Sequence, residues 1–130
     1  METSRIAAFR VFADLPSAEL ERLASAMSEV DVEAGDAVVT NGDFGYALYV
    51  IEEGEADVVV EGDDAERVLG PGDTFGEIAL LVTGRRTATV VARTPMRLLW
   101  LFDQDFRRIR RDVPEFERSL RRLGGERLGA

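Results

Sequence analysis

The hydrophobic pattern changes its period twice along the chain, and this change limits the folds that the chain can form. Between residues 30 and 102, short runs rich in Val, Ile, Leu and Tyr alternate with turn signals such as Asn41-Gly42 and Pro71-Gly72. The order Pro then Gly fits a type II turn. The predicted strands are residues 38–40, 47–51, 56–61, 67–69, 87–92 and 96–102. Strands this short, spaced by about 8–12 residues, indicate an antiparallel sandwich, barrel or jelly roll.

Helical spacing precedes the strands. Residues 14–29 place apolar side chains at i, i+3, i+4 and i+7, namely at Leu20, Leu23, Ala24 and Met27. Pro16 falls in the predicted first turn, and Asp14 or Ser17 can cap it. Apolar residues upstream are expected to add a short helix or loop, so that residues 9–29 form an N-terminal helical segment.

Helical spacing returns after residue 102 in two apolar stripes, which Pro114 separates and which end near the glycine pair 124–125. The stripes consist of Phe106, Ile109 and Val113, then Phe116, Leu120 and Leu123. Asp103 or Asp105 can cap the first of the two helices. No internal repeat and no long linker divides the sequence, so we expect one mainly β domain with flanking helices over residues 1–130.

The composition excludes several kinds of active site. The chain contains neither Cys nor His, which excludes disulfides, thiolate nucleophiles, Ser-His-Asp triads and Cys/His metal sites. Any activity must therefore come from carboxylates, arginines, hydroxyls and backbone dipoles, and we expect no metal and no cofactor. No apolar run approaches the roughly 18 residues of a membrane span. We expect a cytoplasmic protein.

Charge is divided unevenly along the chain. The net charge is −9, and every positive side chain is an arginine. Residues 1–84 carry 4 Arg against 19 Asp and Glu, whereas residues 85–130 carry 12 Arg against 6. The overall acidity argues against nucleic acid as a partner. A genomic composition bias is one explanation of the arginine usage. A guanidinium is also the better cation for two-point binding of an oxyanion, so the asymmetry raises the question of where an anion could bind.

Residues 75–82 interrupt the strand pattern, because they are apolar but begin with Gly-Glu and contain helix formers. They could form a strand, or a short helix between two strands. A helix beginning at Gly76 would present unpaired N–H groups to an anion, and Arg86 could complete the site with a charge-assisted pair. Glu77 fits such a site only if it accepts a hydrogen bond from a hydroxyl of the same ligand. An anion with an adjacent hydroxyl describes a nucleotide sugar-phosphate.

These residues resemble a known binding motif. The run Phe75-Gly76-Glu77-Ile78-Ala79-Leu80, followed by Arg86-Thr87-Ala88, is similar to the phosphate-binding cassette of the cyclic nucleotide-binding domain family. The Gly-Arg-Arg-Thr-Ala string most resembles the cassettes of cyclic nucleotide-regulated channels. The resemblance extends to Gly42-Asp43 and Gly54-Glu55 and covers about residues 9–123. It implies an antiparallel jelly roll over residues 30–102, a cassette with a short helix over 75–88, and hinge and lid helices over 103–124.

The resemblance also implies ligand contacts within the cassette, which Phe75 opens. Arg86 would pair with the exocyclic oxygens of the cyclic phosphate, while Glu77 and the Gly76 amide would hold the ribose 2′-hydroxyl. The amides that would face the phosphate belong to Ile78, Ala79 and Thr87. Thr87 is compatible with either base, and we favour cAMP over cGMP.

Contacts to the base are expected from outside the cassette, at Val59, Arg67 and Leu69 on the roll and at Arg122 and Leu123 on the lid. Each has a structural alternative: Val59 and Leu69 could be core residues, and the apolar lid side chains could serve packing. Core positions are also expected for Trp100 and Phe102. Within the cassette, the alternative for Arg86 is a surface ion pair, and the alternative for Glu77 is an interaction with the helix dipole. Arg85 is expected to be a solvated charge.

The expected function is that of a regulatory module. The ligand would draw the cassette inward, the hinge helix would follow, and the last helix would close over the base, with an unidentified protein or domain as effector. Two alternatives remain at this point. The chain could be a nucleotide-blind jelly roll that mediates protein interactions, or the sensory fragment of a larger regulator.

Overall fold

The strands form two antiparallel sheets that face each other. The computed structural model describes residues 1–43, 45–60, 67–76, 86 and 88–126. Within these ranges, one sheet has the order β1-β8-β3-β6 and the other β2-β7-β4-β5. The strands are β1 (Ser28–Val32), β2 (Ala37–Val39), β3 (Ala47–Glu53), β4 (Ala56–Val59), β5 (Arg67–Leu69), β6 (Thr74–Phe75), β7 (Thr89–Ala92) and β8 (Met96–Phe102). The chain is therefore a mainly antiparallel β jelly roll with flanking helices.

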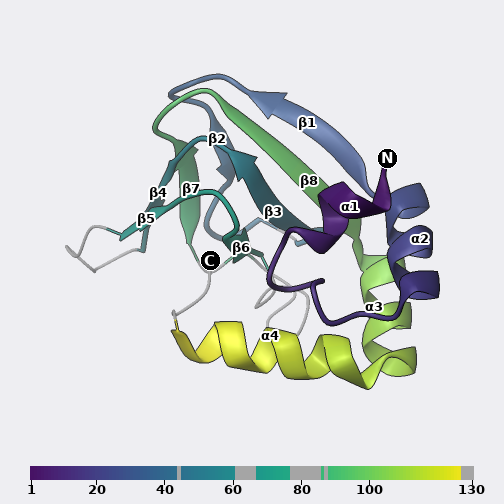
Figure 1. Cartoon of the computed structure of the whole chain (residues 1–130). Coiled ribbons are helices and arrows are strands. Elements are labelled where there is room, and N and C mark those ends of the chain that lie inside the picture. The colour runs from purple at the N-terminus through teal and green to yellow at the C-terminus, as the bar shows by residue number, and fades with distance from the viewer. Residues whose placement is uncertain (44, 61–66, 77–85, 87, 127–130) are drawn as a thin grey trace.

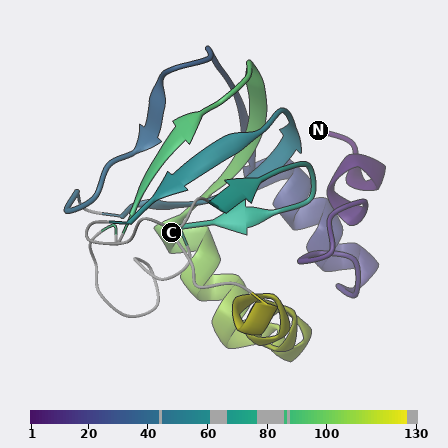
Figure 2. The ribbon, with the colours of Figure 1, turned by 90° about the vertical axis from the view of Figure 1, so that its left-hand side faces the viewer.

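The helices gather on one side of the strands and beneath them, as both views of the ribbon show (Figures 1 and 2). They are α1 (Thr3–Ala7), α2 (Ser17–Ala26), α3 (Asp103–Asp112) and α4 (Pro114–Glu126). Side chains alternate across each strand. Leu48 and Val50 of β3 therefore pack among the helices, whereas Ile51 and Leu98 pack between the two sheets. The molecule has one core under the helices and one inside the roll.

The aromatic side chains of the helical core join its N- and C-terminal parts. Phe116 of α4 stacks on Phe12, with 6.0 Å between ring centroids, and meets Phe106 of α3 edge to face at 5.6 Å. All three rings are buried. The segment before α2 and the two C-terminal helices therefore share one apolar core with the sheet.

Most of the expected elements are present, but their ends differ from the prediction. Strands 67–69 and 96–102 match, and β3 continues to Glu53. The helix predicted for 14–29 ends at Ala26, because residues 28–32 form β1 along the edge of β8. Strand β6 was missed, because it has only two residues. The ends of predicted strands 56–61 and 87–92, and the expected cassette helix, lie outside the described residues.

The predicted helix caps are wrong. Pro16 precedes α2 as its N-cap, and Ser17 is already helical. Asp103 is the first residue of α3, and its carboxylate accepts a hydrogen bond from Nε of Arg107 at 2.6 Å. Because this carboxylate pairs with a residue one turn further along α3, it does not bond to the free backbone N–H groups at the start of the helix. Among the described residues, neither helix has a side-chain cap.

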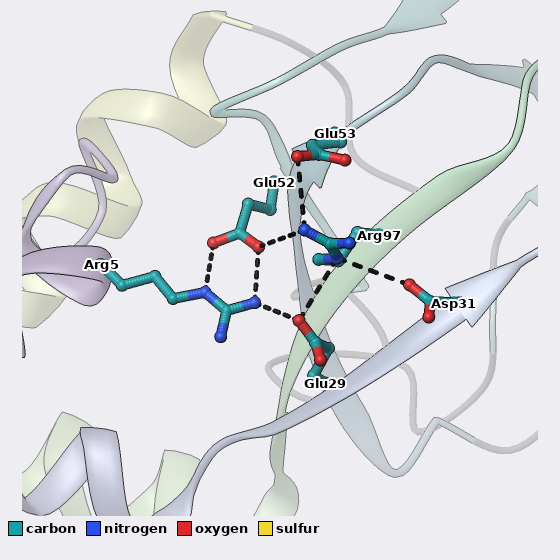
Figure 3. A network of polar contacts seen from close by, with 6 residues as sticks. All are labelled: Arg5, Glu29, Asp31, Glu52, Glu53 and Arg97. Atoms are coloured by element: carbon teal, nitrogen blue, oxygen red, sulfur yellow. Dashed lines mark hydrogen bonds and ion pairs between the residues drawn. The ribbon is translucent and has the colours of Figure 1, made fainter. Parts of the chain in front are cut away.

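A charge network fastens α1 to the roll (Figure 3). Arg5 of α1 donates hydrogen bonds from Nε and Nη2 to the two carboxylate oxygens of Glu52 on β3, at 2.5 and 2.6 Å, and also to Glu29 on β1. Arg97 of β8 lies 3.3 Å from both Glu29 and Glu53. Two guanidinium groups thus join the N-terminal helix to three strands of one sheet.

The network predicts a pH-dependent contribution to stability. The hydrogen bonds from Arg5 hold the pKa of the Glu52 carboxyl below its usual value. A lowered pKa in the folded state stabilises the fold above the ordinary glutamate pKa, and this stabilisation is lost as the pH falls through the lowered value. In urea unfolding, Arg5→Ala should lower the free energy of unfolding by about 1 kcal/mol near pH 7. The difference from the parent should shrink below about pH 4.

A matched control is Arg22→Ala, which removes an exposed arginine that pairs within its own helix, with Glu19 at 3.4 Å. Its expected loss is under about 0.5 kcal/mol. An Arg5→Ala loss that stays constant from neutral to acid pH would contradict the role given to the Glu52 carboxylate.

Candidate functional site

A cavity of about 250 Å³ opens between the two sheets, at the end of the roll where β3 begins and β8 ends. The backbone N–H of Asp103 donates to the carbonyl of Tyr46 at 2.8 Å, so the first residue of α3 is bonded to the cavity rim. The lining side chains include Val39, Tyr46, Tyr49, Arg86, Trp100 and Phe102. Among the described residues, the cavity therefore combines aromatic side chains with the guanidinium of Arg86 and with the acidic Asp43.

Arg86 is the cation of the cavity, and it is almost fully buried at 5% exposure. Its Nη1 donates to the Gly76 carbonyl at 3.1 Å and its Nη2 to the Ala47 carbonyl at 2.9 Å. Its own backbone is bonded to the 42–43 turn, with the N–H of Arg86 donating to the carbonyl of Asp43 at 2.6 Å. A charge held in this way, away from bulk water, interacts strongly with an anion that enters the cavity.

Gly76 follows β6 and is the residue that lets this arginine approach. Its φ is +96°, which favours glycine. A Cβ on Gly76 would lie 2.9 Å from the Ala47 carbonyl oxygen and would collide with the Arg86 guanidinium. The sequence predicted a glycine that permits a close approach to a ligand. In the structure, the group that approaches is the arginine that lines the cavity.

Aromatic rings pack beside the guanidinium of Arg86. Tyr49 stacks on Phe75 with centroids 5.0 Å apart and on Trp100 at 6.2 Å, and Trp100 contacts Phe102 at 4.5 Å. Burial raises the pKa of the Tyr49 phenol, and the charge of Arg86 opposes that shift. The phenol is therefore neutral at physiological pH, and the aromatic side chains beside Arg86 carry no charge.

Other predicted site residues lie apart from this cavity or beyond the described residues. Glu77, Ile78, Ala79 and Thr87, and the side chain of Leu123, are outside the described part. Phe75 is buried beneath Tyr49, and Leu69 is a core residue of the roll. Arg67 is half-buried on β5. None of these described residues lines the cavity.

Two further predicted base contacts face elsewhere in this structure. Val59 is 53% exposed on β4, so its alternative as a core residue is wrong. Arg122 of α4 lies 3.4 Å from Asp14 in an exposed ion pair with the N-terminal segment. The structure thus brings Gly76 and Arg86 together, with Phe75 behind them, and leaves Val59 and Arg122 at other surfaces.

The prediction that Trp100 and Phe102 are core residues is also wrong. Both line the cavity, and Phe102 is 45% exposed. Alternation along β8 explains this, because Leu99 and Leu101 take the face that packs against the helices. Tyr46 and Tyr49 were missed as cavity residues. Alternation along β3 could have placed Tyr49 on the face away from Leu48 and Val50, whereas Tyr46 precedes the strand and has no such signal.

Two features are absent from the described residues. Within those ranges, no group of three or more acidic side chains is placed to hold a metal ion. Across the same part of the chain, no helix has the length and apolarity needed to cross a membrane.

The fold and the cavity together define a ligand-binding jelly-roll domain whose buried cation favours an anion. The family model described as cyclic nucleotide-binding domain matches residues 29–112. The chain belongs to the cyclic nucleotide-binding domain family.

Relatives from different kinds of protein agree with this assignment. A cAMP-dependent protein kinase regulatory subunit from Yarrowia lipolytica is 41% identical over 76% of this chain and 27% of its own length. A cyclic nucleotide-gated potassium channel from Rhizobium etli is 35% identical over 95% of this chain and 34% of its own. The regulatory subunit of a cAMP-independent protein kinase A from Trypanosoma brucei superposes with a TM-score of 0.82 at 28% identity, covering 94% of this chain and 45% of that one. The chain spans about a third or less of the length of the curated relatives that it matches.

Proposed function

We propose that this domain binds a 3′,5′-cyclic nucleotide, with cAMP favoured over cGMP, and that Arg86 holds the cyclic phosphate. The observation that supports this most directly is a guanidinium that is almost fully buried and yet lines a cavity. The cyclic phosphate carries one negative charge and two exocyclic oxygens. A guanidinium fork matches that geometry, and the exclusion of water strengthens the pair.

The other contacts of the ligand are proposed from the cassette. Glu77 and the Gly76 amide would hold the ribose 2′-hydroxyl, and the amides that follow would share the phosphate. Base contacts at Val59, Arg67 and Leu69 would lie on the other sheet, since β4 and β5 carry these residues. For Arg122 and Leu123 to reach the base, α4 would have to leave the position in which Arg122 pairs with Asp14.

A regulatory role is proposed from the way the cavity is joined to the helices. The cavity includes Phe102, the N-cap residue of α3, and Tyr46, whose carbonyl accepts the N–H of Asp103. A ligand that repositions this rim would shift α3, and α4 with it through the Phe106–Phe116 contact. The ligand changes the populations of two states only by its different affinities for them. The effector is an unidentified protein or domain, and the role is binding without catalysis, in the cytoplasm.

Thermal unfolding with added nucleotide tests the proposed function. A ligand present at about 100 times its Kd should stabilise the domain by about 2.7 kcal/mol, which raises the melting temperature by several degrees. We expect this with cAMP, a smaller shift with cGMP, and little with 5′-AMP, whose phosphate is not cyclic. A larger shift with cGMP than with cAMP would reverse the base preference and leave the cyclic phosphate assignment intact.

The competing function is a jelly roll that binds protein partners without a nucleotide. One observation favours it, because the regulatory subunit from Trypanosoma brucei with the similar fold belongs to a kinase named as cAMP-independent. Retention of Gly76, Glu77 and Arg86 favours the nucleotide-binding function. An unchanged melting temperature with both cyclic nucleotides would support the interaction module instead.

A further inference from the structure

The cation of the cavity rests on an aromatic platform, which we define as Tyr49 with Phe75 and Trp100 on either side of it. The Cζ of Arg86 lies 5.7 Å from the centre of the Tyr49 ring. That distance is within the range at which a guanidinium and an aromatic face attract each other. The two backbone carbonyls that accept from Nη1 and Nη2 fix the edge of the guanidinium, and the ring supports it from another direction.

The platform cannot easily shift. Phe75 is 1% exposed and stacks on Tyr49 with an angle of 12° between the rings. Trp100 stacks from the next strand at 19°. The three rings come from β6, β3 and β8, which are hydrogen-bonded neighbours in one sheet. The ring under Arg86 is therefore held by the sheet as well as by its stacked partners.

We propose that Tyr49 is a positioning residue, which presents the Arg86 guanidinium to the anion through its aromatic face. This inference rests on the proposed function, since the anion is the cyclic phosphate. An arginine held in its binding geometry loses little conformational freedom when the ligand arrives, and such preorganisation raises affinity. Without the ring, Arg86 keeps its two carbonyl acceptors and loses the support that fixes the plane of its guanidinium.

The test compares two variants. Tyr49→Phe keeps the aromatic ring, whereas Tyr49→Leu replaces the ring with an aliphatic side chain. Titration with cAMP should give a Kd about five- to tenfold weaker for Tyr49→Leu and within about twofold of the parent for Tyr49→Phe. The matched control is Val50→Ala on the opposite face of the same strand, in the helical core. It should lower the melting temperature and leave the Kd for cAMP unchanged.

A double-mutant cycle separates positioning from a general structural role. In the Arg86→Ala background, followed by nuclear magnetic resonance titration with cAMP, Tyr49→Leu should cause no further loss of affinity. An equal loss in both backgrounds, or a loss for Tyr49→Phe as large as that for Tyr49→Leu, would overturn the proposal.

Failure of the proposed function would leave this inference testable. If the parent chain binds neither cAMP nor cGMP, the same cycle is measured by thermal unfolding without ligand. The melting temperature of the double variant should then fall by less than the sum of the two single losses. Purely additive losses would show that Tyr49 does not hold Arg86.

Discussion

Arg86→Ala is expected to weaken cyclic nucleotide binding by about 2–5 kcal/mol, which is roughly 30-fold to several thousandfold in Kd. The substitution removes one member of a charge pair at a position where the guanidinium is almost fully buried. The phosphate would then enter the cavity with no guanidinium to replace its hydration. Titration calorimetry of the variant with cAMP, beside the parent, measures the loss.

The matched control is Arg93→Ala. It removes the same charge from an exposed arginine that pairs with Asp57 at 3.3 Å, away from the cavity lining. Its Kd should stay within about twofold of the parent, because exposed charges are screened by solvent and salt. If Arg86→Ala binds as tightly as Arg93→Ala, the assignment of the phosphate to Arg86 is wrong.

Phe116→Ala should produce the largest loss of stability, about 3–5 kcal/mol in the free energy of unfolding. Phe116 is fully buried between Phe12 and Phe106, so truncation opens a hole at the junction of α4, α3 and the N-terminal segment. A domain of this size often has only about 5–15 kcal/mol in total. The melting temperature should fall by about 10–20 °C in a thermal melt followed by circular dichroism.

Val68→Ala provides the comparison, since Val68 is an exposed apolar residue on β5. Its expected change is within about 0.5 kcal/mol. A Phe116→Ala loss of similar size would mean that α4 does not pack in the helical core with α3 and the N-terminal segment, and the proposed route from the cavity to α4 would lose its basis.

Periodicity predicted the strands well where turn residues separate them. Strand 67–69, which ends before the Pro71-Gly72 turn, and strand 96–102, which follows residues 93–95, have the predicted bounds. Periodicity failed where pairing with a distant strand determined the secondary structure. Ser28–Val32 forms a strand because the edge of β8 is available, and Met27 fits the preceding helical stripe equally well. A local pattern carries no information about which distant edge is free.

The candidate site was likewise predicted only in part. The cassette motif predicted that Gly76 and Arg86 belong to one site, because it specifies both residues and their spacing, but it did not predict the hydrogen bond between them. The aromatic wall of the cavity was not predicted. Tyr49 and Trp100 are 51 residues apart in the sequence, and only the register of β3 against β8 places them opposite each other. Large apolar side chains near a strand end suggest a core until the open end of the roll shows that they border a cavity.

The central claim is that this chain binds one 3′,5′-cyclic nucleotide per domain, and titration calorimetry with cAMP tests it most directly. We predict a saturable heat with one site per chain and a Kd well below about 1 mM. Absence of any heat with cAMP and with cGMP up to about millimolar concentration would contradict the claim.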